Sequence, residues 1–355
     1  MIDDGAAPVS APSPDPLGPA PVRAAVVGCG DVATIHFESI AAIEDAELVA
    51  VCDTDASALE QAARITGAPA YTDLGTMLRE VRPDVVHITT PHNAHADPTI
   101  QALEAGVHVI QEKPLAHTLA EGERIVAAAE EAGQRGVKIG ICFQNRYNVS
   151  AERAREMLDA GAIGEVTGAW ASVEWARTEG YYRAKPWRGT WEGSGGGLLI
   201  NQAIHTLDLI QWLLGDVVKI DGHAATRRYG HVIEVEDTAE ALFTHASGVE
   251  TTFFATLTSP ATHPVELEIV GTGGRISIRG GLKLTRVDGT KEKWKERKAT
   301  SAGRAYWGVS HELFIRDFYR RLGDPELFWI SPAEAMKSLH MLKAIYHQSF
   351  GADHI

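Results

Sequence analysis

The chain has 355 residues, of which 45% are apolar and 23% charged, and its formal net charge is −14. This length exceeds one ordinary hydrophobic core and indicates two domains, and the composition is typical of a globular protein. The negative charge argues against a nucleic-acid or anionic-membrane partner, because no basic cluster offsets it. No apolar run is long enough to cross a bilayer.

Residues 1–21 are rich in Pro, Ala, Ser and Asp. They lack the basic start and the apolar middle of a secretory signal, so we expect a disordered tail. The three cysteines, Cys29, Cys52 and Cys142, are widely spaced, which fits a reducing cytoplasm. The spacing of cysteines, histidines and acidic residues supports no metal site.

The strongest local pattern begins with the apolar run Ala24–Val27, which predicts a strand buried on both faces. Residues Gly28–Ala33 follow in the pattern G-x-G-x-x-A and lead into a helix, and Glu47–Cys52 is a second strand. Gly28 permits the tight turn, and Gly30 lets a pyrophosphate approach the backbone. The N-terminus of the helix offers free N–H groups to phosphates, so this stretch predicts a dinucleotide site.

Asp53 ends the second strand, twenty positions beyond Ala33. A carboxylate there can accept both hydroxyls of an adenosine ribose. Its charge repels a 2′-phosphate, and residues 54–57 contain no Arg or Lys to bind one, so the pattern favours NAD(H) over NADP(H). The residues of this stretch that we expect to bind the dinucleotide are Gly28, Cys29, Gly30, Asp31, Val32 and Asp53.

Strands and helices alternate as far as residue 145. Further strands are expected at Asp84–Thr89, Val107–Gln111 and Val137–Phe143, and helices at Ala56–Thr66, Thr72–Val81, Asp97–Ala105 and Thr118–Gly133. The alternation predicts an α/β Rossmann domain with a doubly wound parallel sheet over residues 22–145. The ligand of such a sheet lies beyond the carboxyl ends of its strands. The residues there that we expect to border the cofactor are Thr90, Pro91, Asn93, Glu112 and Lys113.

The pattern changes from Ser150 onward. Short connections predict two antiparallel hairpins, Asp237–His245 with Val249–Thr258 and Val265–Val270 with Arg275–Arg279. A long strand is expected at Glu165–Trp175, and helices at Glu152–Ala160, Leu198–Leu214, Glu312–Leu322 and Pro332–Ser349. Residues 146–355 are therefore expected to form an α+β domain with a mainly antiparallel sheet.

Three stretches together resemble one family. They are the glycine turn ending in Ala33, the Glu112–Pro114 loop, and residues 195–208, in which three glycines precede His205 and Asp208. On these residues the chain is similar to the glucose–fructose oxidoreductase / inositol dehydrogenase / rhizopine-catabolism (Gfo/Idh/MocA) family, from Arg23 to about Ser349.

The resemblance implies a Rossmann domain followed by a domain with a large open-faced sheet, whose face commonly mediates homodimers or homotetramers. It also implies that the final helix, at about residues 332–349, can return to the first domain. The implied activity is the oxidation or reduction of a sugar, cyclitol or similar polyol with a pyridine nucleotide.

His205 is our first candidate for the group that handles the proton of the substrate hydroxyl, because imidazole titrates near neutrality. On a regular helix, Asn201, His205 and Asp208 stand at i, i+4 and i+7 and share one face. Asp208 could then orient the imidazole. The alternative is that His205 is a polar residue on a half-buried helix and Asp208 belongs to an unrelated ion pair.

Lys113 follows a buried strand, on the loop beside the cofactor. Its ammonium can donate to the substrate oxygen and stabilise charge there, whereas the alternative is a solvated lysine. Many dehydrogenases of the resembled family carry Asp where this chain has Asn201. An amide cannot pass a proton, so any second proton route must use Lys113, Asp208 or water.

An aromatic and arginine-rich loop spans Arg177–Trp191. Aromatic faces suit sugar rings, and arginine can bind hydroxyl or carboxylate oxygens. The same residue types are enriched at oligomer interfaces, so both interpretations stay open. The residues expected to contact substrate are Arg146, Tyr182, Trp187, Arg188, Asn201 and His205.

The sequence therefore predicts a cytoplasmic, NAD(H)-dependent oxidoreductase that transfers a hydride between the nicotinamide and a secondary alcohol or ketone of a sugar, sugar acid or cyclitol. Two alternatives remain. One is a glycosidase that retains NAD and uses transient oxidation. The other is a non-catalytic NAD-binding regulator.

Overall fold

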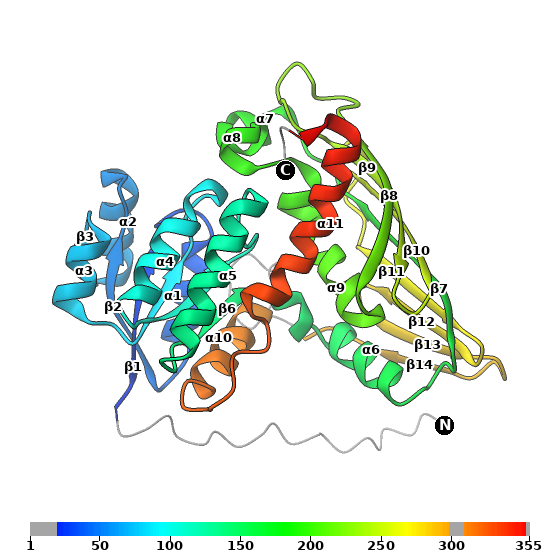
Figure 1. Cartoon of the computed structure of the whole chain (residues 1–355), viewed down its shortest axis with the longest axis horizontal. Coiled ribbons are helices and arrows are strands. Elements are labelled where there is room, and N and C mark those ends of the chain that lie inside the picture. Colours follow the sequence, from blue (N-terminus) through cyan, green and yellow to red (C-terminus); the bar gives the residue numbers. More distant parts are fainter. Residues whose placement is uncertain (1–19, 298–308, 353–355) are drawn as a thin grey trace.

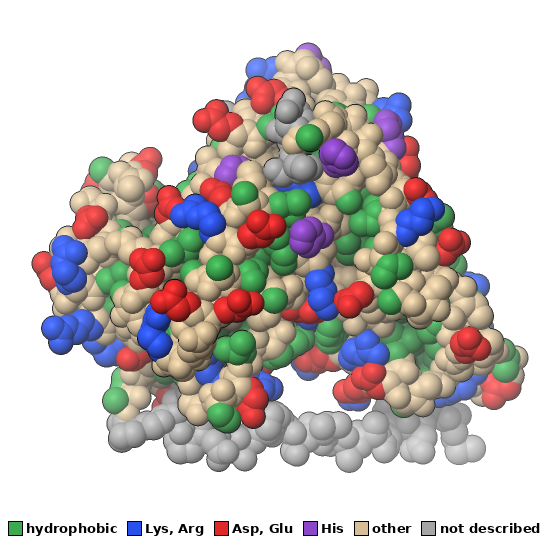
Figure 2. Space-filling view, in the orientation of Figure 1, with side chains coloured by type: hydrophobic (Ala, Val, Ile, Leu, Met, Phe, Trp, Pro, Cys, Tyr) green, Lys and Arg blue, Asp and Glu red, His purple; other side chains and the backbone are tan. Residues whose placement is uncertain are grey.

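The computed structural model describes residues 20–297 and 309–352, which form two lobes (Figure 1). The tail predicted at residues 1–21 falls almost wholly on residues 1–19, outside the described residues. Among the described helices, none is long and apolar enough to cross a membrane. Figure 2 shows acidic and basic side chains interspersed over the visible face, without a continuous basic area.

The first lobe is built on a six-stranded parallel sheet in the order β3-β2-β1-β4-β5-β6. Its strands are β1 (Val22–Val27), β2 (Ala46–Cys52), β3 (Ala70–Tyr71), β4 (Val85–Ile88), β5 (His108–Glu112) and β6 (Ile139–Cys142). All four residues of β4 and all four of β6 are buried, as expected for strands covered on both faces. The predicted doubly wound sheet is confirmed, and the two-residue strand β3 is an addition.

Helices connect these strands, and two of the main ones begin at side chains that accept from free backbone N–H groups. Asp55 accepts from Ser57 and Ala58 at the start of α2, and Thr118 accepts from Glu121 at the start of α5. The helices of this lobe are α1 (Ala33–Ala41), α2 (Ala56–Thr66), α3 (Leu74–Val81), α4 (Ala96–Glu104) and α5 (Leu119–Gly133), with the short turn η1 (His92–Ala94). In contrast, no side chain caps α1.

The second lobe holds an eight-stranded sheet in the order β14-β13-β12-β11-β7-β10-β9-β8. Its strands are β7 (Val166–Glu174), β8 (Val217–Ala225), β9 (Thr238–His245), β10 (Glu250–Thr256), β11 (Glu266–Gly271), β12 (Gly274–Arg279), β13 (Leu282–Arg286) and β14 (Lys291–Trp294). Only β7 and β10 pair in parallel, so the sheet is mainly antiparallel, as predicted. Both expected hairpins are confirmed, whereas β8, β13 and β14 were not predicted.

Figure 1 shows helices on the side of this sheet that faces the first lobe, and none of the described helices on the opposite side. These elements are η2 (Gln144–Tyr147), α6 (Val149–Asp159), α7 (Glu179–Arg183), η3 (Pro186–Gly189), α8 (Trp191–Ser194), η4 (Leu199–Ala203), α9 (Ile204–Leu214), α10 (Ser310–Arg320) and α11 (Pro332–Phe350). The loop expected at Arg177–Trp191 therefore contains α7 and η3.

The last two helices tie the lobes together. α10 packs against α1 and η2, and α11 packs against α5 of the first lobe as well as α9 and β8 of the second. The chain thus crosses between the lobes more than once. A single division near residue 145 stays a sequence prediction.

Candidate active site

The glycine turn between β1 and α1 has room for a ligand. Gly28 has φ +90°, and a Cβ there would lie 2.6 Å from the backbone nitrogen of Thr90. At Gly30, a Cβ would meet no atom within 4 Å, so open space lies against the backbone. The uncapped N–H groups of α1 begin just beyond, at Val32. This open cradle at a helix N-terminus that no side chain caps fits a pyrophosphate.

Asp53 stands at the end of β2, beside that turn. Its Oδ2 accepts from the backbone N–H of Cys29 at 2.5 Å, and its Oδ1 accepts from that of Asp55 at 2.8 Å. Two carboxylate oxygens offer about four acceptor positions, so two remain for a ribose diol. The Cys29 thiol donates to the Cys52 carbonyl at 3.7 Å and stays inside the turn.

Lys113 brings the two lobes into contact at the carboxyl end of β5. Its Nζ donates to the backbone carbonyl oxygen of Asn201, 3.0 Å away on the second lobe. Burial lowers the pKa of the Lys113 ammonium, the negative charge of Glu112 opposes that shift, and the nearby charge of Arg188 adds to it. Lys113 is therefore a half-buried ammonium and not a solvated side chain.

His205 is half-buried at the start of α9, with its ring edge against Phe143 at a centroid distance of 5.8 Å. Burial lowers its pKa to about 3, and the positive charge of Lys113 contributes to the shift. The imidazole is therefore neutral at physiological pH. Its Nδ1 is buried and has no hydrogen-bond partner among the described residues.

The regular helix predicted over Leu198–Leu214 is wrong at its start. Leu199–Ala203 form a π-helical turn, and the α-helix begins only at Ile204. π-Helical turns are rare and occur frequently at functional sites. Here the carbonyl of Asn201 that accepts from Lys113 lies within the wider turn.

The three glycines before this turn are in close contact with three different segments of the chain. Side chains at Gly195, Gly196 and Gly197 would run into His117, Tyr346 and Glu236, respectively. The buried Glu236 also accepts from the N–H groups of Gly197 and Leu199 at 2.8 and 2.7 Å. Burial raises the pKa of Glu236 to about 7. These contacts fix where the π-turn starts, and sequence spacing gave no sign of Glu236.

Asp208 and Arg146 have other partners than predicted. They form a buried bidentate ion pair, with Arg146 Nε and Nη2 donating to Asp208 at 2.8 and 2.6 Å. Arg146 Nη2 also donates to Glu334 on α11 at 3.0 Å, and Ser338 donates to Asp208 at 3.4 Å. Among the described residues, no hydrogen bond joins Asp208 to His205. The predicted orienting carboxylate and substrate-binding guanidinium instead anchor η2, α9 and α11 to one another.

The arginine-rich loop reaches across to the first lobe. Arg188 Nη2 lies 3.5 Å from an oxygen of Asp31 in the glycine turn, and its guanidinium stacks on Tyr181 at 4.6 Å. The Trp187 ring meets the edge of His92 at 5.0 Å. These contacts place Arg188 and Trp187 at the mouth of the cofactor turn.

Tyr182 is buried in the second lobe. It is 3% exposed and packs between Tyr181 and Tyr229, with ring centroids 5.1 and 5.7 Å away. Its hydroxyl has no hydrogen-bond partner among the described residues. Substrate contact by Tyr182 stays a prediction.

The loop after β4 closes the other side of the site. His95 lies between this loop and the Glu112–Pro114 loop, with Nε2 3.0 Å from the Thr90 carbonyl oxygen and Nδ1 2.8 Å from that of Pro114, and a neutral ring donates to one of the two. Asn93 is exposed, and Pro91 precedes η1. Glu112 is buried against His36 and His311, whereas we had predicted that it borders the cofactor. Neither histidine was a candidate, because nothing in local spacing connects positions so far apart.

A Rossmann sheet with an open glycine turn, a terminal carboxylate, and a lysine and a neutral imidazole at the lobe junction defines a nicotinamide-dependent oxidoreductase. Comparisons with known proteins agree. Residues 22–140 match the oxidoreductase family model with an NAD-binding Rossmann fold, and residues 151–277 match the GFO/IDH/MocA C-terminal domain. The chain belongs to the Gfo/Idh/MocA family of oxidoreductases.

Named relatives include the D-apiose dehydrogenase of Paraburkholderia graminis, 32% identical over 76% of this chain and 71% of that protein. The NAD⁺-dependent scyllo-inositol 2-dehydrogenase of Bacillus subtilis is 30% identical over 72% and 73%. Among solved structures, the WlbA dehydrogenase of Bordetella pertussis in complex with NADH and UDP-GlcNAcA is 32% identical, with a TM-score of 0.79 over 94% of this chain and 98% of that one. These relatives favour the oxidoreductase over the glycosidase and the regulator.

Proposed function

We propose that the protein is an NAD(H)-dependent dehydrogenase that transfers a hydride between the nicotinamide and a secondary alcohol or ketone of a sugar, sugar acid or cyclitol. The observation that carries this proposal is the hydrogen bond from Lys113 Nζ to the Asn201 carbonyl. It joins the loop after β5 to the turn that precedes His205, so both proton-handling candidates belong to one site at the cofactor end of the sheet.

NAD supplies the hydride acceptor, or the hydride when reduced, at C4 of its nicotinamide ring. The residues proposed to hold the cofactor are Gly28, Cys29, Gly30, Asp31, Val32, Asp53, Thr90, Pro91, Asn93 and Lys113. Gly30 leaves the backbone open to the phosphates, and Asp53 accepts the ribose hydroxyls. Arg188 adds a cation beside the glycine turn.

The hydroxyl proton passes to this chain as the hydride leaves the carbinol carbon. Lys113 Nζ binds the substrate oxygen and takes or gives this proton, and burial favours its neutral form by lowering its pKa. His205 stays neutral and hydrogen-bonds the same oxygen through a ring nitrogen. The Asn201 amide orients a neighbouring hydroxyl without exchanging a proton.

The proposed substrate class rests on the relatives and on the loop at the lobe junction. Two of the relatives are named as dehydrogenases of D-apiose and scyllo-inositol. The similar solved structure is a complex with UDP-GlcNAcA. Trp187 offers an aromatic face for a sugar ring, and Arg188 offers a planar cation for hydroxyl or carboxylate oxygens. Both contacts support a polyhydroxylated ligand.

The direct test is a screen of sugars, sugar acids and cyclitols for NADH formation at 340 nm. We expect at least one substrate whose oxidation requires NAD⁺, and NADP⁺ should serve poorly. Cleavage of a glycoside without net NADH would support the NAD-retaining glycosidase instead. Tight NAD binding with no turnover on any member of the panel would contradict the proposal.

We further propose a homodimer or homotetramer through the outer face of the eight-stranded sheet. Trp170 on β7 and Phe254 on the neighbouring β10 are 39% and 41% exposed, which is unusual for large aromatic residues away from an interface. Light scattering should give a molar mass that is a multiple of 38.3 kDa, and Trp170→Glu should lower that molar mass. A cytoplasmic location is proposed because Cys29, Cys52 and Cys142 are all free thiols.

A further inference from the structure

A chain of buried hydrogen bonds ends on the carboxylate next to Lys113. The Tyr319 hydroxyl lies 2.6 Å from His87 Nε2, and His87 Nδ1 lies 2.8 Å from His36 Nδ1. His36 Nε2 lies 3.2 Å from Glu112 Oε1, and His311 Nε2 lies 3.3 Å from the same oxygen. All five side chains are buried, with exposed fractions of 5% or less.

The ionised Glu112 sets the direction of every bond in this chain. Burial opposes its ionisation, but the hydrogen bonds from His311 and His36 hold the pKa of Glu112 well below its usual value. A carboxylate only accepts, so His36 must carry its proton on Nε2 and leave Nδ1 as an acceptor. His87 then donates from Nδ1 and accepts from Tyr319 at Nε2. The bonds from Tyr319 to Glu112 are then all made with His36 and His87 neutral.

This arrangement connects the cofactor helix with the lysine loop. His36 lies on α1, directly after the glycine turn, while His311 lies on α10, which follows the second sheet. The other carboxylate oxygen of Glu112 accepts from the backbone N–H of Lys113 at 3.2 Å. Glu112 is therefore held by α1 and α10, which are far apart in the sequence, and in turn holds the backbone N–H of Lys113.

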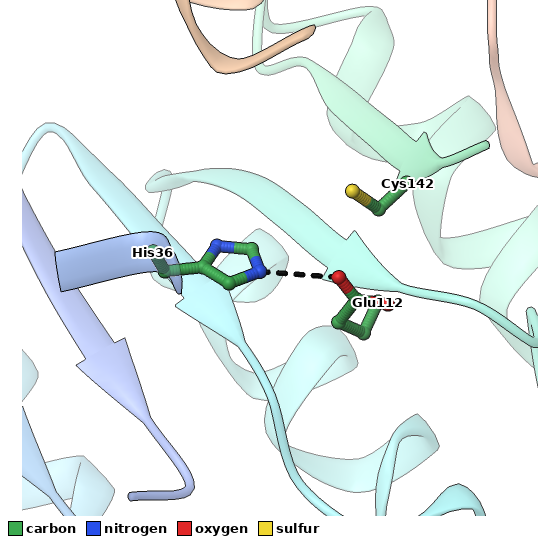
Figure 3. Close-up of side chains that lie close together, drawn as sticks. All are labelled: His36, Glu112 and Cys142. Carbon is green, nitrogen blue, oxygen red and sulfur yellow. Dashed lines mark hydrogen bonds and ion pairs between the residues drawn. The ribbon is translucent and has the colours of Figure 1, made fainter. Parts of the chain in front are cut away.

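A metal ion is the competing explanation for this cluster. A ring nitrogen of His36, a carboxylate oxygen of Glu112 and Cys142 Sγ lie within 4.8 Å of one another, and Figure 3 shows His36 and Glu112 facing each other beside Cys142. However, burial raises the pKa of Cys142 well above its usual value, and the thiolate is the form that binds metals. The histidine nitrogens that face Glu112 are already used as hydrogen-bond donors. The observations favour a metal-free hydrogen-bond network.

We propose that Glu112 is a positioning residue that acts through Lys113: fixed by His36 and His311, its carboxylate orients the lysine loop and keeps a negative charge beside the ammonium during catalysis. The proposal rests on the dehydrogenase function proposed above. It gives Glu112 a role in the protonation of Lys113 and none in contact with substrate. The charged and titratable groups that interact with Lys113 are Glu112, Cys142, Arg188, His92, His95 and His205.

Among these groups, Glu112 is the one whose negative charge raises the Lys113 pKa most. The positive charge of Arg188 works in the opposite direction. An opposite charge near a buried group favours its charged form, and Glu112 acts on the ammonium through space, since no ion pair joins the two side chains among the described residues. Replacing Glu112 by the neutral and nearly isosteric Gln should therefore make Lys113 lose its proton at lower pH.

The first experiment measures Lys113 itself and needs no substrate. Competitive acetylation of the intact protein over a pH series, read by mass spectrometry of the Lys113 peptide, gives the pH of half-maximal reactivity. We expect Glu112→Gln to lower it by at least about one pH unit and Glu112→Asp to restore part of the shift. His311→Leu should also lower the pH of half-maximal reactivity. His311→Gln keeps an N–H donor to Glu112 and should lower it less. An unchanged Lys113 titration in folded Glu112→Gln would overturn the proposal.

The second experiment separates positioning from a merely structural role. If Glu112 acts through Lys113, Glu112→Gln should reduce kcat by about 10–100-fold in the wild-type background and by less than about 2-fold in Lys113→Ala. Equal losses in both backgrounds would contradict it. The proposal would also be contradicted if the purified wild-type protein contained one equivalent of transition metal per chain and His36→Gln contained none. If the wild type turned over no substrate, the proposed dehydrogenase function would be wrong. The acetylation experiment would still decide whether Glu112 acts on Lys113.

Discussion

Lys113 Nζ lies 3.0 Å from the backbone carbonyl oxygen of Asn201, a residue 88 positions further along the chain. This hydrogen bond joins the cofactor lobe to the turn that presents His205. The half-buried ammonium lies at the carboxyl end of β5, near enough for its charge to lower the pKa of His205. The catalytic consequences of this arrangement are open to direct tests.

Replacing Lys113 by Ala should reduce kcat about 10²–10⁴-fold, because the reaction loses the group that exchanges the hydroxyl proton. The Kd for NAD, measured by fluorescence titration, should change less than about 3-fold, because Lys113 is expected to act on the substrate oxygen. The exposed Lys219→Ala is the matched control and should keep full turnover. A Lys113→Ala enzyme with wild-type kcat would remove this residue from the mechanism.

His205→Ala should also lower kcat, by about 10²-fold, since a hydrogen bond to the reacting oxygen is lost. Because burial holds the pKa of His205 at about 3, its protonation cannot cause an acidic limb at pH 5–7. The pH profile of kcat/KM over that range should therefore keep its shape in His205→Gln. A limb between pH 5 and 7 that vanishes in this variant would mean that His205 titrates near neutrality after all.

Asp53→Ala should raise the Kd for NAD by at least about 10-fold, since a charged acceptor of two ribose hydroxyls is removed. The preference for NAD over NADP should fall as well, because the charge that repels a 2′-phosphate is gone. Asp73→Ala, which removes the cap of α3, controls for a general loss of helix stability. Retention of full NAD preference in Asp53→Ala would place the ribose elsewhere.

The buried pair Arg146–Asp208 should matter for stability more than for chemistry. Asp208→Asn removes the bidentate partner of Arg146 while Glu334 still pairs with the guanidinium, at a cost of about 1.5–3 kcal/mol in the free energy of unfolding. The exposed pair Arg64–Glu60 provides the control, and Glu60→Gln should cost less than about 1 kcal/mol. The kcat of folded Asp208→Asn should stay within about 5-fold of the wild type. A loss of several orders of magnitude would instead restore Asp208 as the residue that orients His205.

Stability should fall as the pH drops from 7.5 to 5.5, because burial lowers the pKa of several histidines in the folded state. These are His36, His87, His92, His95 and His205. Below about pH 6.5 the unfolded chain binds protons that the folded chain does not, so the free energy of unfolding decreases on acidification. Each histidine that stays neutral contributes about 1.4 kcal/mol over this interval.

Urea unfolding at pH 7.5, 6.5 and 5.5 measures this effect, and we expect a total decrease of at least about 3 kcal/mol. His87→Gln should reduce the pH dependence, whereas the exposed His223→Gln should leave it unchanged. A free energy of unfolding that is constant over this range would contradict the expected burial of these rings.

Short-range patterns predicted the parts of the site that one segment supplies. The spacing from Gly28 to Asp53 predicted the cofactor turn, because strand, turn, helix and acid follow one another in the chain. The same reasoning failed for Asp208. Its predicted alignment with His205 assumed a regular helix, whereas the structure has a π-turn at Leu199–Ala203 and a bidentate arginine partner from η2.

Long-range partners could not be predicted from the sequence. His36, Glu112 and His311 come from α1, β5 and α10, and no local periodicity relates them. The strands β13 and β14 were missed for another reason. β14 is an edge strand and β13 is its neighbour in the sheet, and both are short and rich in charged residues, so alternation of apolar residues is weak there.

The most direct test of the central claim is a crystal structure of the protein with NADH and the ketone product found in the substrate screen. We expect the Lys113 ammonium and a His205 ring nitrogen both within about 3.2 Å of the carbonyl oxygen, with the carbonyl carbon facing the nicotinamide. A product oxygen that contacts neither side chain, or a nicotinamide on the far side of the sheet, would contradict the proposed mechanism.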